Sequence, residues 1–316
     1  MLPSDGIEPL APVGDAWSIA ASKRARLHGT GLLLLAALAW GTGNVSQKTI
    51  LDHLDAYAAN GITCLIGAAV LYPLARREPA TQANGSRGLL LLVALTFTLA
   101  ATLMQVGYGH TSVTNAGFLV NTSAVLTPVI GWVLYRQRPP LLIWPASLCA
   151  LSGVYLMGGG ALSQLAYGDV LALASGLVFA VWNLLVAQYV TRYHRPGFMT
   201  VMQLLCCGVV CLGISVFANG LPQPTAFWAA LPEIVMLGVV SKGFAYALMA
   251  LGMRFVSASA GAILVSTESI FGAACAALFL AERAGYAQVI GGVFIIFGVA
   301  LASCAPVRIE NKLRRR

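Results

Sequence analysis

Long runs of apolar residues recur along the whole chain, each ending after about 20 positions at a charge, a proline or a glycine. Runs such as GLLLLAALAWGTGNV and VIGGVFIIFGVALASC are apolar all round, so they leave no polar face for water. A helix of about 20 apolar residues crosses the hydrocarbon core of a bilayer. We therefore predict ten membrane-spanning helices. Their expected ranges are 30–51, 57–75, 88–108, 113–135, 141–160, 168–191, 197–219, 228–251, 257–280 and 286–305.

The composition agrees with an all-α integral membrane protein. The 316 residues are 58% hydrophobic and only 9% charged, and the mean hydropathy is +0.80. An average soluble domain carries about 25% charged residues, so no separate soluble domain is expected. The net charge of +8 does not indicate nucleic-acid binding, because Lys and Arg are confined to tails and short loops.

The basic residues predict the orientation of the helices. When the N terminus is placed in the cytosol, the inner segments collect most of the Lys and Arg, whereas the outer segments carry mainly Asp and Glu. Both termini are therefore expected in the cytosol. The inner basic positions fall within 23–26, 76–87, 136–138, 192–195, 254 and 308–316.

The two halves of the chain resemble each other. VTNAGFLVNTS at 113–123 matches SASAGAILVST at 257–267, and the first helix of each half carries an asparagine, Asn44 or Asn183, at the same place. Because each half has an odd number of helices, the second copy is expected upside down relative to the first. The expected organisation is a cytosolic tail at 1–28, a first five-helix repeat at 29–160, an inverted repeat at 161–305 and a basic cytosolic tail at 306–316.

The same stretches resemble a known family, the EamA-type members of the drug/metabolite transporter superfamily, and within it the amino-acid and metabolite exporters. The resemblance is carried by GTGLLLLAALAWGTGNV, GDVLALASGLVFAVWN, VTNAGFLVNTSAVLTPVIGWVLYRQR and VSASAGAILVSTESIFGAACAALFLAER. It implies a ten-helix exporter of a bacterial inner membrane, with a cavity built by helices 1, 3, 4, 6, 8 and 9 and with helices 5 and 10 at the periphery. Two departures are YRQR, where a Gly-Glu pair is frequent, and Ser269, where proline often follows the preceding glutamate.

Lys242 and Glu268 are opposite charges deep inside two consecutive apolar runs. Each lies about 12 residues, or ~18 Å, from the turn around Arg254, which places both near the middle of a core ~30 Å thick. An ionisable side chain at that depth costs at least a few kcal/mol and is normally paired or part of a transport path. We expect one pair on one hairpin, facing a cavity. It would either fasten the two helices or handle substrate or protons.

Other polar and aromatic residues are candidates for substrate binding. Trp40, Asn44 and Gln47 follow one another at i, i+4 and i+7 and so share a helical stripe, and Trp182 and Asn183 occupy the corresponding helix of the second half. The remaining candidates are Tyr108, Asn115, Asn121, Thr122, Ser123, Tyr246, Ser266 and Thr267. A structural role is the alternative for each, because Ser and Thr in membrane helices bond their own backbone and aromatic residues also pack or anchor.

These features favour a secondary transporter that exports small amphiphilic metabolites, foremost amino acids, by alternating access. No GxxxxGK[ST], HExxH or GxSxG motif occurs, and the seven cysteines show no CxxC spacing, so we expect neither an enzyme nor a metal or other cofactor. The expected partners are a small-molecule substrate and membrane lipid, in a monomer or weak homodimer. A transporter of nucleotide-sugars or other organic metabolites, a membrane enzyme acting on a lipid intermediate and a non-transporting receptor remain alternatives. For energy coupling, either Glu268 exchanges a proton during the cycle or the protein is a facilitator.

Overall fold

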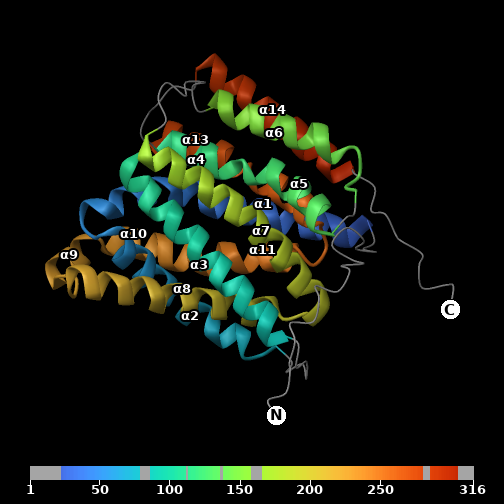
Figure 1. Cartoon of the computed structure of the whole chain (residues 1–316). Helices are drawn as coiled ribbons and strands as arrows, with labels where there is room; N and C mark the ends of the chain where they lie inside the picture. Colours follow the sequence, from blue (N-terminus) through green and yellow to red (C-terminus); the bar gives the residue numbers. More distant parts are fainter. Residues whose placement is uncertain are drawn as a thin grey trace, which may run out of the picture.

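The computed structural model describes residues 23–78, 86–111, 113–135, 138–157, 166–279 and 285–304, and the secondary structure of these residues is helical throughout (Figure 1). The first group of helices is α1 (Lys23–Thr49), η1 (Ile50–Asp52), α2 (Ala56–Ala75), α3 (Ser86–His110), α4 (Val113–Asn121), α5 (Ser123–Tyr135) and α6 (Ile143–Met157). The second is α7 (Tyr167–Tyr193), α8 (Pro196–Asn219), α9 (Pro224–Ala229), α10 (Leu231–Val235), η2 (Met236–Ala245), α11 (Tyr246–Gly252), α12 (Ala258–Val265), α13 (Glu268–Phe279) and α14 (Tyr286–Cys304).

Many of these helices have the length and apolarity of membrane spans. In the described part of the chain, α2, α3, α7, α8 and the stretch Leu231–Gly252 meet both criteria, and shorter apolar helices lie at Leu119–Leu134, Ile143–Leu156 and Val289–Cys304. Their ends fall within a few residues of the ranges expected from the sequence. The protein is therefore a multi-pass helical membrane protein.

The helices pack in pairs drawn from the two halves of the chain. In Figure 1, α6 and α14 lie together along one edge, and α2 and α8 lie together on the opposite side. Between these pairs, α1 packs against η2, α11, α12 and α13, whereas α7 packs against α3, α4 and α5. The first long helix of each half is thus embedded among helices of the other half.

Glycines let two of these helix pairs approach backbone to backbone. A Cβ atom at Gly41 would lie 2.5 Å from the carbonyl oxygen of Glu268, so α1 and α13 touch at this point without intervening side chains. A Cβ atom at Gly153 in α6 would lie 2.5 Å from the carbonyl oxygen of Gly291 in α14. Close contact at small residues is a common way for membrane helices to associate, because dispersion contacts replace the hydrophobic driving force that lipid removes.

The spans expected at 113–135 and 257–280 are not continuous helices. The first is broken at Thr122, between α4 and α5, and the second at Ser266 and Thr267, between α12 and α13. At each break a hydroxyl group donates to the carbonyl three residues earlier, over 2.6 Å for Thr122 and 2.7 Å for both Ser266 and Thr267. Such bonds compete with the helical hydrogen-bond pattern. The apolar periodicity of the sequence did not predict these breaks.

Proline at position 128 removes one backbone N–H inside α5. The carbonyl that would have accepted from this position belongs to Ala124, four residues earlier. Ser147 Oγ on α6 donates to that oxygen over 3.0 Å, in a site where both residues are buried. The neighbouring α6 therefore supplies the hydrogen bond that the proline removes.

The span expected at 228–251 also departs from a regular α-helix. Its central part, η2, is a π-helix, whose wider turns carry Ser241 and Lys242. Trp40 Nε1 on α1 donates to the carbonyl oxygen of Ser241 over 3.0 Å. π-helical turns in proteins are frequently found at functional sites, and this one lies beside the cavity described next.

Candidate substrate-binding cavity

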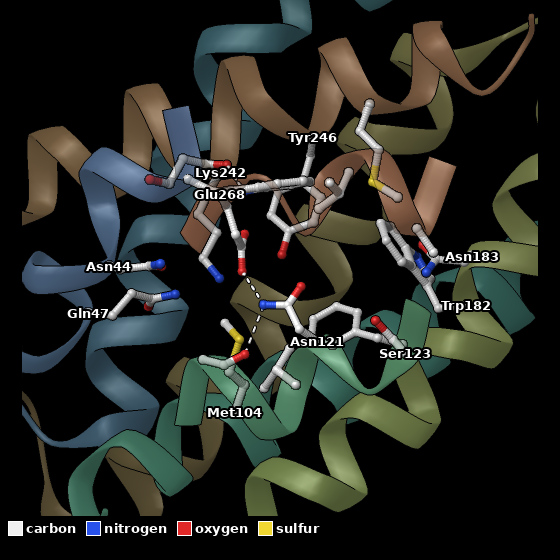
Figure 2. Close-up of a pocket in the computed structure, with 18 of the residues that line it drawn as sticks. Asn44, Gln47, Met104, Asn121, Ser123, Trp182, Asn183, Lys242, Tyr246 and Glu268 are labelled. Atoms are coloured by element: carbon white, nitrogen blue, oxygen red, sulfur yellow. Dashed lines mark hydrogen bonds between the residues drawn. The ribbon is translucent and has the colours of Figure 1, made fainter. Parts of the chain in front are cut away.

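A cavity of about 80 Å³ lies among the helices at the centre of the bundle (Figure 2). On the same measure one water molecule needs roughly 10–15 Å³, so this space holds several waters or a small solute. The lining comes from α1, α3, α4, α5, α7, η2, α11, α12 and α13, that is, from both halves of the chain. In the described part of the chain, neither α6 nor α14 contributes to it.

Lys242 lies on the cavity wall with 2% of its surface exposed. Its Nζ is 5.9 Å from the ring centre of Phe97 and 5.8 Å from that of Tyr246, both within cation–π range. Within the described residues its ammonium makes no hydrogen bond and no ion pair. The backbone at Lys242 is held close to α2, because a Cβ atom at Gly67 would lie 2.9 Å from the Cβ of Lys242.

Glu268 is the first residue of α13 and is half-buried on the cavity wall. Asn121 Nδ2, at the end of α4, donates to Glu268 Oε1 over 3.1 Å and to the carbonyl oxygen of Gly117 over 2.8 Å. Figure 2 shows both bonds. The expected pairing of Lys242 with Glu268 is therefore wrong: both face the cavity, but the carboxylate is bonded by an amide and the ammonium lies over aromatic rings.

The pair was predicted by counting residues from the turn around Arg254, and such a count gives only part of the geometry. Counting residues from the turn fixes the depth of a side chain in the membrane, and both charges do lie on one cavity. It does not fix the direction in which each side chain points around its helix axis. The helix break before Glu268 and the π-helical turns around Lys242 both change that direction.

An aromatic cluster forms one wall of the cavity. The ring of Tyr246 lies 4.8 Å from that of Trp40, 4.9 Å from Phe97 and 5.7 Å from Trp182, all in edge-to-face contact. Trp182 also meets Phe179 at 5.6 Å, and its Nε1 donates to Gln203 Oε1 over 2.9 Å. These rings offer a rigid apolar surface, because edge-to-face contacts and a bonded indole hold their orientation.

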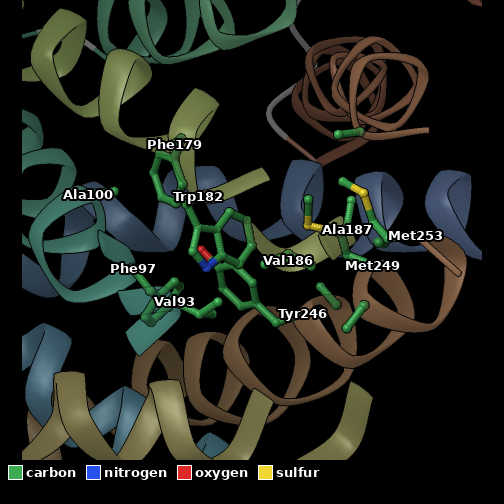
Figure 3. Packing of buried hydrophobic residues seen from close by; sticks show 14 of the residues in the cluster. Val93, Phe97, Ala100, Phe179, Trp182, Val186, Ala187, Tyr246, Met249 and Met253 are labelled. Atoms are coloured by element: carbon green, nitrogen blue, oxygen red, sulfur yellow. The ribbon is translucent and has the colours of Figure 1, made fainter. Parts of the chain in front are cut away.

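Beyond the aromatic cluster, toward the ends of α7 and α11, side chains fill the space. Val186, Met249 and Met253 are buried and pack together with Trp182 and Tyr246 (Figure 3). Met249 belongs to both this packing and the cavity wall.

Near the opposite ends of α1 and α3, polar contacts tie the helices together. Lys48 Nζ donates to the carbonyl oxygens of Tyr108 and Thr111, over 2.6 and 3.1 Å, and Thr111 Oγ1 donates to Asp169 Oδ1. Gln105 Nε2 also donates to the carbonyl oxygen of Gln47 over 3.0 Å. Lysine here satisfies carbonyls at a helix C-terminus, where the partial charge is negative.

The structure brings most of the predicted site residues to this one cavity. Those that line it are Trp40, Asn44, Gln47, Tyr108, Asn121, Ser123, Trp182, Asn183, Lys242, Tyr246 and Glu268. Thr122, Ser266 and Thr267 do not line it and bond backbone carbonyls of their own helices instead. The side chain of Asn115 lies outside the described residues. Whether any of these residues binds substrate stays a prediction.

Several lining residues were not predicted from the sequence. They are Met104, Gly117, Val120, Phe179, Ser241, Met249, Ala262 and Val265. Phe179 carries a usable signal, because it stands at the position of Trp40 when the two halves are aligned. The others are small or apolar residues, and nothing in their sequence context separates a cavity wall from a packed helix face.

Two further observations concern possible metal sites and the class of protein. Among the described residues, no cluster of three or more His, Cys, Asp or Glu side chains is placed to hold a metal ion. A helical membrane protein whose two halves line a central, mainly apolar cavity with a few polar groups belongs, by architecture, with proteins that handle small molecules within the bilayer.

The family is shown by the sequence. The model of the EamA-like transporter family matches residues 27–159 and, a second time, residues 166–304, so the chain belongs to this family and has two EamA halves. The family is one of transporters, not of enzymes.

Relatives and a solved structure agree with this assignment. An uncharacterized transporter of Archaeoglobus fulgidus is 24% identical over 88% of this chain and 86% of its own length. The uncharacterized transporter YwfM of Bacillus subtilis is 21% identical over 87% of this chain and 93% of its own. A crystal structure titled only "Crystal structure of protein" superposes with a TM-score of 0.68 over 89% of this chain and 97% of that chain, at 17% identity, and thus shows the same fold.

Proposed function

We propose that this transporter exports small amphiphilic metabolites, foremost amino acids, by alternating access through the central cavity. The observation that carries the proposal is the cavity itself: helices of both halves enclose it, and it combines one buried ammonium, one carboxylate and an aromatic wall. Small-molecule sites are typically apolar pockets with a few convergent polar groups. In transporters they lie near the midplane at the interface of two repeats.

The helix packing supports two inverted repeats. α1 with its neighbours η2, α11, α12 and α13 corresponds to α7 with its neighbours α3, α4 and α5, and the pairs α2 with α8 and α6 with α14 join equivalent helices. The breaks at Thr122 and at Ser266 and Thr267 occur at matched positions of the two halves. Ten membrane spans in two inverted halves, with both termini in the cytosol, account for these pairings and for the distribution of basic residues.

With that orientation, the packed ends of α7 and α11 face the cytosol. Val186, Met249 and Met253 then lie on the inner side of the cavity. Movement of one half relative to the other would have to open this packing for a solute to enter from the cytosol, and the contacts of Lys48 would have to open for it to leave.

The charges of the lining favour amino acids over nucleotide-sugars. Lys242 is the single cation among the described lining residues, whereas a diphosphate is usually bound by several cationic or bidentate donors. The volume of about 80 Å³ also suits a small solute better than a nucleotide. The aromatic wall matches an apolar or aromatic side group.

We expect the protein to act in a prokaryotic plasma membrane, the bacterial inner membrane being the first choice. Relatives occur in both archaea and bacteria, so they support a prokaryotic plasma membrane but do not favour a bacterial over an archaeal one.

Counterflow into liposomes tests the proposed function. Purified protein would be reconstituted into liposomes preloaded with one unlabelled amino acid or metabolite at a time, and uptake of the labelled compound would be followed with and without an imposed pH gradient. Accumulation of an amino acid above that in protein-free liposomes supports the proposal, and a response to the gradient would indicate proton coupling. Lack of counterflow for every amino acid would overturn it, and counterflow of a nucleotide-sugar instead would favour the alternative.

A further inference from the structure

We propose that Lys242 and Glu268 bind the two charged ends of a zwitterionic substrate, Lys242 its carboxylate and Glu268 its ammonium group. This inference rests on the proposed function, because it assumes that an amino acid enters the cavity. The inference adds to the proposed function the way in which the substrate is recognised, which the family resemblance does not supply.

The ammonium of Lys242 has unused hydrogen-bonding capacity. It is a donor of three hydrogen bonds with 2% of the residue exposed, and it makes no hydrogen bond or ion pair within the described residues. The rings of Phe97 and Tyr246 supply only cation–π contacts at 5.9 and 5.8 Å. Buried charges in proteins are normally paired and hydrogen-bonded, so this ammonium lacks an anion.

The carboxylate of Glu268 has free acceptor capacity on the same cavity. Two carboxylate oxygens accept about four hydrogen bonds, and among the described residues only Asn121 donates one, at 3.1 Å. Figure 2 shows the carboxylate of Glu268 and the amide of Asn121 pointing into the space that Lys242 also borders. The bond from Asn121 holds the carboxylate in place and leaves its other oxygen for a cationic group.

Two further amides of residues on the cavity wall have buried oxygens that find no hydrogen-bond partner among the described residues. They belong to Gln47 on α1 and Asn183 on α7, which are 7% and 4% exposed. Both oxygens are closed to solvent, so a ligand in the cavity would reach them only if these side chains turned.

The separation of the two charges argues against a purely anionic or purely cationic ligand. Lys242 and Glu268 form no ion pair with each other, and a ligand that neutralised only one of them would leave the other, buried Lys242 or half-buried Glu268, without an opposite charge. A zwitterion neutralises both at once. Its side group would then lie against Trp40, Trp182 and Tyr246, whose rings form the aromatic wall.

The test compares three probes that differ in one charge each. L-phenylalanine is the zwitterion, L-phenylalaninamide lacks the carboxylate, and 3-phenylpropionate lacks the ammonium group. Competition of each compound against counterflow of labelled L-phenylalanine gives its apparent affinity for the wild-type protein and for the variants Lys242→Met and Glu268→Gln. We expect the wild type to prefer L-phenylalanine over both analogues by roughly 10- to 100-fold, the range for a lost hydrogen bond to a charged group.

Each variant should lose one preference and keep the other. Lys242→Met should bind L-phenylalanine no better than its amide, and Glu268→Gln no better than 3-phenylpropionate, whereas a merely structural role would weaken all three probes alike. Lys242→Arg, which keeps the charge, should restore part of the preference. Glu233→Gln is the matched control, because Glu233 bonds Thr49 and does not line the cavity.

Two failures are distinguishable. If the wild type exchanges L-phenylalanine but each variant keeps both preferences, the charge assignment is wrong and the proposed function stands. If the wild type exchanges no amino acid, both fall. Should Lys242→Met or Glu268→Gln not be recovered as folded protein, the wild type and Lys242→Arg still decide, because equal competition by all three probes in the wild type overturns the inference.

Discussion

Replacement of Ser147 by alanine isolates one hydrogen bond that holds two helices together. Pro128 leaves the carbonyl of Ala124 without its helical donor, and Ser147 Oγ fills that place at 3.0 Å in a site where both residues are at most 1% exposed. Ser147→Ala should therefore leave a buried carbonyl unbonded. Such a group costs about 1–3 kcal/mol in soluble proteins, and interhelical hydrogen bonds in membranes average about 0.6 and reach about 1.7 kcal/mol. We expect a loss of about 1 kcal/mol in the free energy of unfolding.

A second background makes this prediction specific. In the Pro128→Ala protein the restored backbone N–H can bond the carbonyl of Ala124, so the further change Ser147→Ala should cost much less, about 0–0.5 kcal/mol. The free energies of unfolding of the four proteins would be measured by denaturant titration in mixed micelles. If Ser147→Ala costs the same in both backgrounds, the hydroxyl does not replace the bond that proline removes, and the reasoning is refuted.

Three other changes test the helix contacts around the cavity. Gly41→Ala should lower the free energy of unfolding by about 1–3 kcal/mol, since its Cβ would lie 2.5 Å from a carbonyl oxygen of α13. Gly31→Ala is the control and should not lower it, because a Cβ atom there has nothing within 4 Å. Equal unfolding midpoints of the two variants would contradict this. Trp40→Phe keeps an aromatic ring, though a smaller one, and loses the 3.0 Å bond to η2, so the counterflow rate should fall by roughly 5-fold and the free energy of unfolding by about 1 kcal/mol. Unchanged values for both would show that the bond is dispensable. Lys48→Met removes the two bonds to carbonyls of α3 and of the loop after it. An impermeant maleimide added outside should then label a cysteine placed at Asn44 faster. An unchanged labelling rate would mean that this contact does not block access to the cavity from outside.

Much of the fold follows from the sequence alone, because bilayer thickness limits the length of an apolar run. The observed helices begin and end near the expected positions, as α2 at Ala56–Ala75 and α8 at Pro196–Asn219 illustrate. Irregular backbone was not foreseen. The breaks at Thr122 and at Ser266, and the π-helix at Met236–Ala245, depend on local competition between side-chain and backbone hydrogen bonds and on packing against neighbouring helices.

The sequence likewise predicted only part of the candidate site. Polar and aromatic residues such as Trp40, Asn183 and Glu268 stand out in apolar runs, and they do meet at one cavity. The hydroxyls of Ser266 and Thr267 stand out equally but serve the helix break, because a hydroxyl can bond its own backbone where an amide or a charge does not. Which way Lys242 and Glu268 point depends on helix rotation, and no residue count along one chain supplies that angle.

Closing the cavity from within tests most directly the claim that substrate passes through it. Gly117 lies on the cavity wall, and a Cβ atom there would meet nothing within 4 Å, so Gly117→Leu should fill the space without disturbing the surrounding helices. Its counterpart Gly31→Leu adds the same side chain at an exposed position of α1 that also has nothing within 4 Å. In amino-acid counterflow, Gly117→Leu should fall to the level of protein-free liposomes while Gly31→Leu stays near the wild type. Wild-type counterflow by Gly117→Leu would place the transport path elsewhere and contradict the account.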